Sequence, residues 1–156
     1  MAKCCGLCGT CWQSSKCTKS HASRRLDGIM TSARDTTTIL EAMQLYFDGL
    51  YHADTKILAK VFHPDARYVN VTENDYMNFS VAEYFDAVSK RTPPSQNNDP
   101  RNDVIETITF GEPDMAFVRA RMSMMRRDYL DFLTFIKTDE TWQIMSKIFT
   151  YKPQED

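Results

Sequence analysis

The five cysteines of this chain are the residues whose type and spacing could most directly do chemistry. All of them lie in the first 17 residues: Cys4, Cys5, Cys8, Cys11 and Cys17. The last four follow the pattern C-x2-C-x2-C-x5-C, and C-x-x-C loops allow two thiolates to reach one metal ion or iron–sulfur cluster. His21 follows closely and is a candidate for an extra zinc ligand. A [4Fe–4S] motif normally closes with a shorter last gap and a proline, and this run has neither.

The surroundings of these cysteines favour a simpler interpretation. Residues 1–29 are rich in Ser, Lys, Gly and Cys and show neither helical nor strand periodicity, whereas Met30 opens a stretch typical of a domain start. We therefore expect residues 1–34 to be a disordered head and residues 35–156 to be the folded domain. A metal or redox site and a set of disulfides remain alternatives for the head, so we assign no metal and no cofactor. The sequence leaves open whether Met1 or Met30 is the true start.

Composition and charge narrow the class of protein. The chain has 156 residues, of which 42% are hydrophobic and 26% are charged, as in one soluble globular domain. No apolar run approaches the ~18–20 residues that cross a bilayer, and the N-terminus lacks the apolar segment of a secretory signal. The net charge is −2, and residues 1–34 are basic, so the rest of the chain is acidic. We therefore expect a cytoplasmic protein that binds neither nucleic acid nor membrane.

Capping residues and apolar periodicity predict three helices in the first part of the domain. Thr38 and Glu41 form a capping box before the first helix, and Asp54 caps a short second helix. Ser80 and Glu83 form a capping box before the third. Segments rich in β-branched and aromatic residues predict strands at 66–72, 76–79, 103–110, 115–126, 128–137 and 142–151. Helices first and most strands last indicate an α+β domain.

The strand predicted at 128–137, with the sequence DYLDFLTFIK, is strongly apolar on both of its faces. A sheet with one face in water would alternate cleanly between apolar and polar residues. We therefore expect one face to line an inner pocket and the other to be buried in a homodimer. The neighbouring strand carries Met122 and Met124, whose flexible side chains suit either an adaptable pocket wall or a plain core.

In this order the elements resemble the nuclear transport factor 2-like, or cystatin-like, superfamily. The stretch YFDGLYHAD at residues 46–54 resembles the end of its first helix, and VFHPDA at 61–66 resembles its helix-to-strand junction. The C-terminal strands at 128–137 and 142–149 look most like the branch called putative lumazine-binding proteins, close to the SnoaL-like polyketide cyclases. The resemblance covers about residues 36–152.

The resemblance implies a cone-shaped fold, in which three N-terminal helices pack on a curved antiparallel sheet around an apolar pocket. Members include ketosteroid isomerase, dehydratases, cyclases and binding modules, so the fold alone names no reaction. Counted from the first helix, Tyr46 falls at the isomerase's oxyanion tyrosine, but its base position holds Asn70, which cannot take up a proton. The acid position falls near Phe132, and strand alternation points Asp131 the other way. Steroid-type isomerisation is therefore disfavoured, unless a slip of one residue brings Asp131 inside.

We therefore expect a domain that binds a small, largely apolar or aromatic molecule. The expected binding residues are Tyr46, Asn70, Met122, Met124 and Phe132. The alternative is a cyclase-, isomerase- or dehydratase-like enzyme that uses Tyr46 and a pocket aspartate, for which Asp128 is the candidate. Tyr46 also suits an ordinary core position on the buried face of its helix. A structural or protein-interaction homodimer is the third alternative.

Overall fold

The computed structural model describes residues 19–111 and 113–155, with side chains from Ala33 onward. The chain divides into two compact units, with the boundary between Asp35 and Thr36. All the strands of the described residues lie in the second unit, Thr36–Asp156. The helices are α1 (Lys19–Tyr51), α2 (Thr55–Val61), α3 (Val81–Lys90) and a 3-10 turn at Pro94–Gln96. Among the described residues, no helix is both long enough and apolar enough to cross a membrane.

The first helix begins much earlier than the sequence pattern predicted. Because α1 starts at Lys19, Thr38 and Glu41 lie inside it and do not form its N-terminal cap. Residues 19–37 contain no proline, so no residue forces a break before the predicted capping box. The cysteine-rich run lies outside the described residues, and its proposed disorder, metal site and disulfides stay predictions.

The other two helices begin where their caps predict. The Asp54 carboxylate accepts hydrogen bonds from the backbone N–H groups of Lys56 at 2.8 Å and Ile57 at 3.2 Å. Ser80 and Glu83 form the predicted capping box at the start of α3.

Six strands form one sheet in the order β2-β1-β6-β5-β4-β3. Their bounds are β1 (Phe62–Asn70), β2 (Met77–Ser80), β3 (Val104–Phe110), β4 (Met115–Met124), β5 (Arg127–Thr138) and β6 (Thr141–Pro153). β1 pairs with β6 in parallel, whereas the other neighbours are antiparallel. The sheet is therefore mixed, where an antiparallel one was predicted, because the long crossover between β1 and β6 allows a parallel pair.

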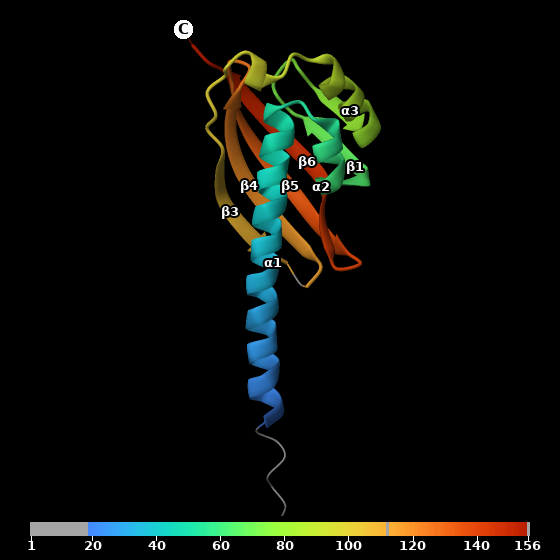
Figure 1. The fold of residues 1–156 in the computed structure, drawn as a ribbon, viewed down its shortest axis with the longest axis vertical. Helices are drawn as coiled ribbons and strands as arrows, with labels where there is room; N and C mark the ends of the chain where they lie inside the picture. Colours follow the sequence, from blue (N-terminus) through green and yellow to red (C-terminus); the bar gives the residue numbers. More distant parts are fainter. Residues whose placement is uncertain (1–18, 112, 156) are drawn as a thin grey trace, which may run out of the picture. The chain divides into compact units, whose positions relative to one another are not determined.

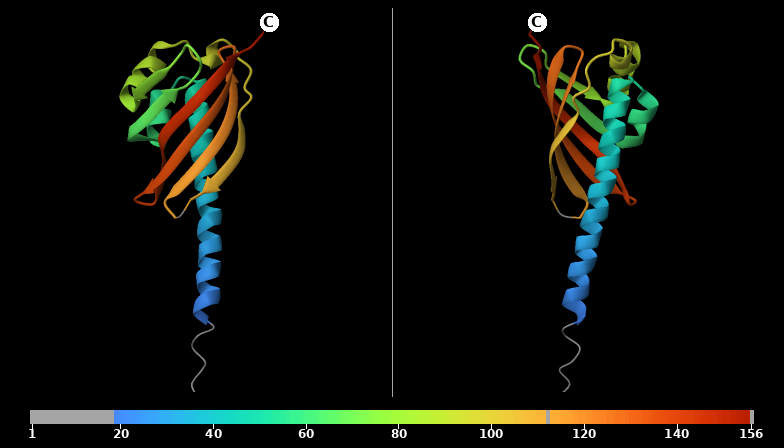
Figure 2. Two further views of the ribbon diagram at one scale, coloured as in Figure 1. Left: turned by 180° about the vertical axis from the view of Figure 1, so that it is seen from behind. Right: turned by 60° about the vertical axis from the view of Figure 1, so that its left-hand side comes forward.

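The helices of this unit lie on one face of the curved sheet, as the ribbon shows (Figure 1). Seen from behind, the opposite face carries no helix in the part of the chain that the structure describes (Figure 2). The core lies between the helices and the inner face, and its fully buried side chains include Tyr46, Leu133 and Phe135. This arrangement confirms the predicted α+β fold.

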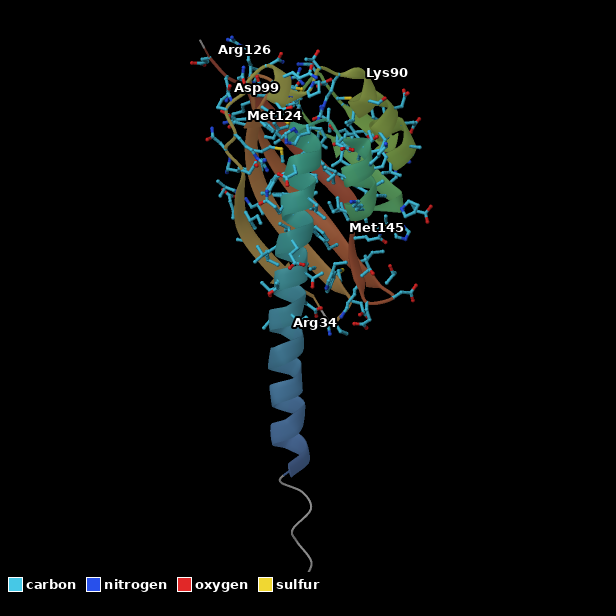
Figure 3. The ribbon with its side chains drawn as sticks, in the orientation of Figure 1. Arg34, Lys90, Asp99, Met124, Arg126 and Met145 are labelled. Atoms are coloured by element: carbon cyan, nitrogen blue, oxygen red, sulfur yellow. The ribbon has the colours of Figure 1, made fainter. Side chains whose placement is uncertain are left out.

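The polar loop after α3 is attached to one end of the sheet. The backbone N–H of Met125, in the turn between β4 and β5, donates to the Asp99 carboxylate at 2.7 Å. Figure 3 shows Asp99, Met124 and Arg126 gathered at this end. Met125 and Arg126 have φ values of 52° and 57°, the left-handed conformation that a two-residue hairpin turn requires.

Candidate functional site

Three polar side chains, Tyr46, Asp131 and Lys147, form a buried cluster in the core. The Tyr46 hydroxyl donates to Asp131 Oδ2 at 2.6 Å. The Lys147 ammonium donates to the Tyr46 hydroxyl oxygen at 2.6 Å and to Asp131 Oδ2 at 2.9 Å. Their exposed fractions are 0% for Tyr46 and Asp131 and 1% for Lys147. A carboxylate, an ammonium and a phenol thus share one dry site, and each of them can serve acid–base chemistry.

Three elements bring these side chains together. Tyr46 lies on the buried face of α1, and Asp131 points inward from β5. Lys147 lies on β6, opposite Leu133 of β5 and opposite Tyr68 of β1. Lys147 is therefore a diagonal cross-strand neighbour of Asp131, within reach of a long side chain. The sheet register, which joins distant parts of the chain, creates the cluster.

The environment of the cluster shifts the pKa values of its members. The Lys147 ammonium lies 4.6, 5.2 and 5.6 Å from the ring centroids of Phe149, Tyr46 and Tyr68, so aromatic faces surround it. Burial lowers the pKa of Lys147, and the Asp131 carboxylate partly offsets this effect. Burial, and then the charge of Asp131, raises the pKa of Tyr46. Asp131 Oδ1 is buried and has no hydrogen-bond partner among the described residues, so one acceptor of the cluster is left unsatisfied.

A cavity of about 150 Å³ opens beside the cluster, between the β1–β2 hairpin and α3. Its wall includes Tyr68, Phe79, Tyr84, Ala87 and Arg91. The rings of Tyr68 and Tyr84 stack with their centroids 4.0 Å apart and their planes 14° apart. The volume is about ten times what one water molecule needs. Tyr68 lines this cavity, and the centroid of its ring lies 5.6 Å from Lys147 Nζ, so the same ring borders both the cavity and the cluster.

The structure places Asp128 and Phe132 on the outer face of the sheet, away from this cavity. Asp128 Oδ1 accepts hydrogen bonds from Ser123 Oγ and Gln154 Nε2, both at 2.7 Å, and these bonds lower its pKa. Phe132 is 41% exposed. This corrects the expected orientation of the strand: the alternation is as predicted, but the face that contains Asp131 is the inner one. Asp131 can face the core because Tyr46 and Lys147 satisfy one of its oxygens.

Asn70 is fully buried, but its side chain has a structural use in the turn between β1 and β2. Its Nδ2 donates to the Asp75 backbone carbonyl at 2.6 Å and to the Asp75 carboxylate at 2.9 Å. Its Oδ1 accepts from the Thr72 backbone N–H at 2.9 Å and from the Thr72 hydroxyl at 2.7 Å. These bonds engage both ends of the amide, so Asn70 holds the hairpin and has little capacity left for a ligand.

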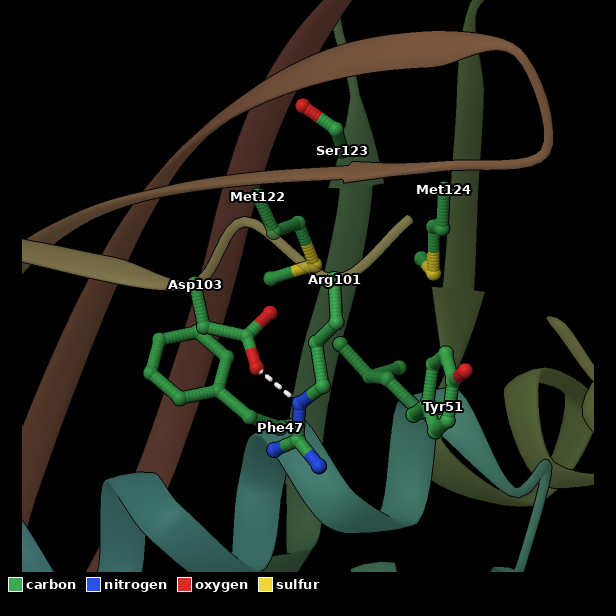
Figure 4. Close-up of a pocket in the computed structure, with 8 residues that line it drawn as sticks. Phe47, Tyr51, Arg101, Asp103, Met122, Ser123 and Met124 are labelled. Atoms are coloured by element: carbon green, nitrogen blue, oxygen red, sulfur yellow. Dashed lines mark hydrogen bonds and ion pairs between the residues drawn. The ribbon is translucent and has the colours of Figure 1, made fainter. Parts of the chain in front are cut away.

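Met122 and Met124 face inward from β4 and are 3% and 6% exposed. They pack beside Phe47 in a second hollow, whose remaining volume of about 10 Å³ holds at most one water molecule. Figure 4 shows Arg101 and Asp103, which form an ion pair with each other and both line this hollow. In the structure these methionines therefore fill the core, which was one of the two interpretations left open for them.

Sequence reasoning did not identify Lys147, and the reason is a β-bulge. The β5–β6 register pairs Thr134 with Ser146 but Phe135 with Ile144, so Met145 is an extra residue. Simple alternation along β6 would therefore place Lys147 on the face opposite to Ile144, whereas both are buried. The available signal was a lysine in the middle of an apolar strand, between Ile144 and Phe149.

Metal binding has no support in the described part of the chain. Within residues 19–111 and 113–155, no group of three or more His, Cys, Asp or Glu could hold a metal ion.

Comparison with known sequences places these features in context. The family model described as "Putative lumazine-binding" matches residues 34–150. A curated protein, "Aldolase FrzH" of Cladobotryum sp, is 27% identical over 118 residues, which cover 74% of this chain and 90% of that protein. Its name describes that protein's activity.

Solved structures share the fold. An NTF2-like protein of unknown function from Shewanella baltica OS155 superposes with a TM-score of 0.70 at 22% identity, covering 78% of this chain and 97% of that one. Another from Methylobacillus flagellatus KT gives a TM-score of 0.68 at 17% identity, covering 76% and 93%. A cystatin-like protein from Burkholderia xenovorans LB400 gives 0.60 at 13% identity, covering 76% and 92%. These likenesses confirm the nuclear transport factor 2-like fold and, at such low identity, show the fold alone.

Proposed function

Because this chain belongs to the family described as "Putative lumazine-binding", we propose that it binds a small molecule with a largely apolar or aromatic part. The observation that carries the proposal is the open cavity whose wall contains the stacked rings of Tyr68 and Tyr84. Phe79 extends this surface, since its ring is nearly parallel to that of Tyr68 at 6.3 Å. A planar ligand would bury apolar surface against these rings, and the ring side chains would lose little conformational entropy on binding.

Filling the mouth of the cavity tests this proposal. Ala87 is exposed on α3 and lines the cavity, so Ala87→Trp is expected to block ligand access while leaving the core intact. The control is Ala82→Trp, because Ala82 is also exposed on α3 but does not line the cavity. We expect Ala87→Trp to weaken binding of a small aromatic probe such as phenylacetate at least tenfold, measured by ligand-observed NMR, with unchanged thermal stability. Equal weakening by both variants would contradict the assignment.

A second candidate function, an enzyme of the aldolase type, is favoured by the cluster of Tyr46, Asp131 and Lys147. The relative named an aldolase supports this choice. In the proposed step, Asp131 takes a proton from the carbon next to a ketone, and the Tyr46 hydroxyl turns its single hydrogen bond from Asp131 to the enolate oxygen. The enolate carbon then forms a bond to the carbonyl carbon of an aldehyde, and the proton returns to the new alkoxide. The Tyr68 ring must rotate for substrate to reach Asp131, which is fully buried.

Proton exchange is the simplest test of this chemistry. In deuterated water, the protein should speed hydrogen–deuterium exchange at the carbon next to the ketone of phenylacetone, followed by NMR. Tyr46→Phe should lower this rate at least tenfold, because it removes the hydroxyl that stabilises the enolate. Tyr151→Phe is the control, since the Tyr151 hydroxyl bonds Asp75 outside the cluster. Exchange no faster than in buffer would end the enzyme proposal and leave the binding proposal standing.

The uncovered outer face of the sheet supports the proposed homodimer. Phe117, Phe132 and Ile148 are 37%, 41% and 43% exposed on this face, and the first two rings meet edge to face at 5.4 Å. Apolar side chains gathered in this way usually mark an association surface. A second copy of the chain could cover them with the same residues about a two-fold axis.

Light scattering after size exclusion tests the dimer. Phe132→Glu is expected to convert a dimer to a monomer, because it would place a charge at the centre of the apolar surface. Tyr76→Glu is the matched control, since Tyr76 is 69% exposed but lies in the turn before β2. A monomeric wild-type protein at micromolar concentration would contradict the dimer.

A further inference from the structure

Two polar groups at the cavity between the β1–β2 hairpin and α3 lack partners. Arg91 Nε and the Tyr84 hydroxyl are buried, and neither has a hydrogen-bond partner among the described residues. Both residues line the cavity, and Tyr84 is only 3% exposed. A buried donor without an acceptor has lost its hydrogen bonds to water and gained none, so two of them beside one cavity point to an acceptor supplied from outside.

The Arg91 side chain is held in place by the end of a helix. Arg91 is the C-cap of α3, and its Nη2 donates to the Leu50 backbone carbonyl near the end of α1 at 2.7 Å. No carboxylate of the described residues forms an ion pair with this guanidinium. The nearby Asp131 is already paired with Lys147. The positive charge of Arg91 therefore has only a neutral carbonyl as its partner.

The charge of Arg91 acts on the same rings that line the cavity. It lowers the pKa values of Tyr84 and Tyr68, against the larger effect of burial, which raises both. Arg91 lines the same cavity as the stacked pair of Tyr68 and Tyr84. Arg91 Nε and the Tyr84 hydroxyl are thus two unpartnered donors on residues that line one cavity with an aromatic wall.

We propose that the ligand of this cavity is a small organic carboxylate with a planar apolar part. One carboxylate oxygen accepts a hydrogen bond from Arg91 Nε and the other accepts one from the Tyr84 hydroxyl, while the planar part lies against Tyr68 and Phe79. The two unpartnered donors match the two oxygens of a carboxylate. A phosphate has more oxygens, and they would need more donors than these two. The proposal rests on the binding function proposed above and names the chemical class of the ligand.

A matched pair of probes tests the proposal. Phenylacetate and phenylacetamide have nearly the same shape, but only the first carries a charge. At pH 7 we expect wild-type protein to bind phenylacetate at least tenfold more tightly, by ligand-observed NMR or calorimetry. In Arg91→Gln this preference should fall to nearly one, and Tyr84→Phe should weaken phenylacetate binding several-fold. Arg91→Lys should restore part of the preference, because it keeps the charge.

The control is Arg67→Gln, because Arg67 is exposed on the same hairpin and does not line the cavity. This variant should keep the wild-type preference for the anion. Equal affinities for the two probes in wild-type protein would overturn the carboxylate proposal and leave the binding function intact. Absence of binding by both probes would overturn the two together. The comparison in wild-type protein decides the proposal even where a variant fails to fold.

Discussion

Replacing Lys147 with methionine is expected to lower the free energy of unfolding by about 3–5 kcal/mol. The substitution leaves Asp131 charged and fully buried, with only the Tyr46 hydroxyl as a donor. Removing one partner of a buried pair costs more than the pair contributes, because the other charge has lost its water as well. Urea unfolding followed by tryptophan fluorescence measures the change.

Two comparisons identify the cause of this loss. Lys90→Met removes an ion pair with Asp86 whose side chains are 72% and 63% exposed, and it should change stability by less than about 1 kcal/mol. Replacing the whole cluster, with Tyr46→Phe, Asp131→Leu and Lys147→Met together, should recover most of the stability lost in Lys147→Met. If this triple variant is less stable than the single one, the cluster itself stabilises the fold, and its retention needs no functional explanation.

Alkaline pH is expected to destabilise the protein steeply, because of the stacked tyrosines Tyr68 and Tyr84. Burial raises the pKa of each above the ordinary value of about 10. Above pH 10 the unfolded chain releases these two protons while the folded chain retains them, so their contribution to stability is full below pH 10 and is lost as pH rises. Each residue should contribute a slope of about 1.4 kcal/mol per pH unit, or about 3 together.

Lys147 has the opposite effect on the pH dependence of stability, and it acts at lower pH than the two tyrosines. Because its pKa is lowered on folding, the unfolded chain binds more protons between that lowered value and about pH 10.4. Stability should therefore rise with pH in this window, and Lys147→Met should remove the rise. The two effects together predict a stability maximum on the alkaline side of neutrality.

Urea unfolding across pH 8–11.5, combined with ultraviolet absorbance of tyrosinate, tests these slopes. Tyr84→Phe should reduce the slope of the loss above pH 10 by about 1.4 kcal/mol per pH unit. It should leave stability at pH 7 unchanged or higher, because the Tyr84 hydroxyl has no partner among the described residues. Tyr76→Phe should leave the slope unchanged, since Tyr76 is exposed. Ionisation of Tyr68 and Tyr84 near pH 10 in the folded protein would contradict the prediction.

The sequence by itself determined the order of the elements and most of their local signals. Asp54 and the capping box of Ser80 and Glu83 satisfy backbone N–H groups within a few residues, so a local pattern is enough to predict these helix starts. The strands followed from β-branched and aromatic composition in the same way. The predicted start of α1 was wrong. A capping motif allows a helix to begin at that point, but it does not end a helix that began earlier in the chain.

Only the tertiary structure decided which face of the sheet is the inner one and which residues form the site. Tyr46, Asp131 and Lys147 lie far apart in the chain and meet through the strand register, while the bulge at Met145 turns Lys147 inward and leaves Ile148 exposed. An aspartate in an apolar strand is expected to face water unless the core contains a hydrogen-bond donor or a cation that can pair with it. Whether such a partner exists depends on long-range pairing, which no local pattern encodes.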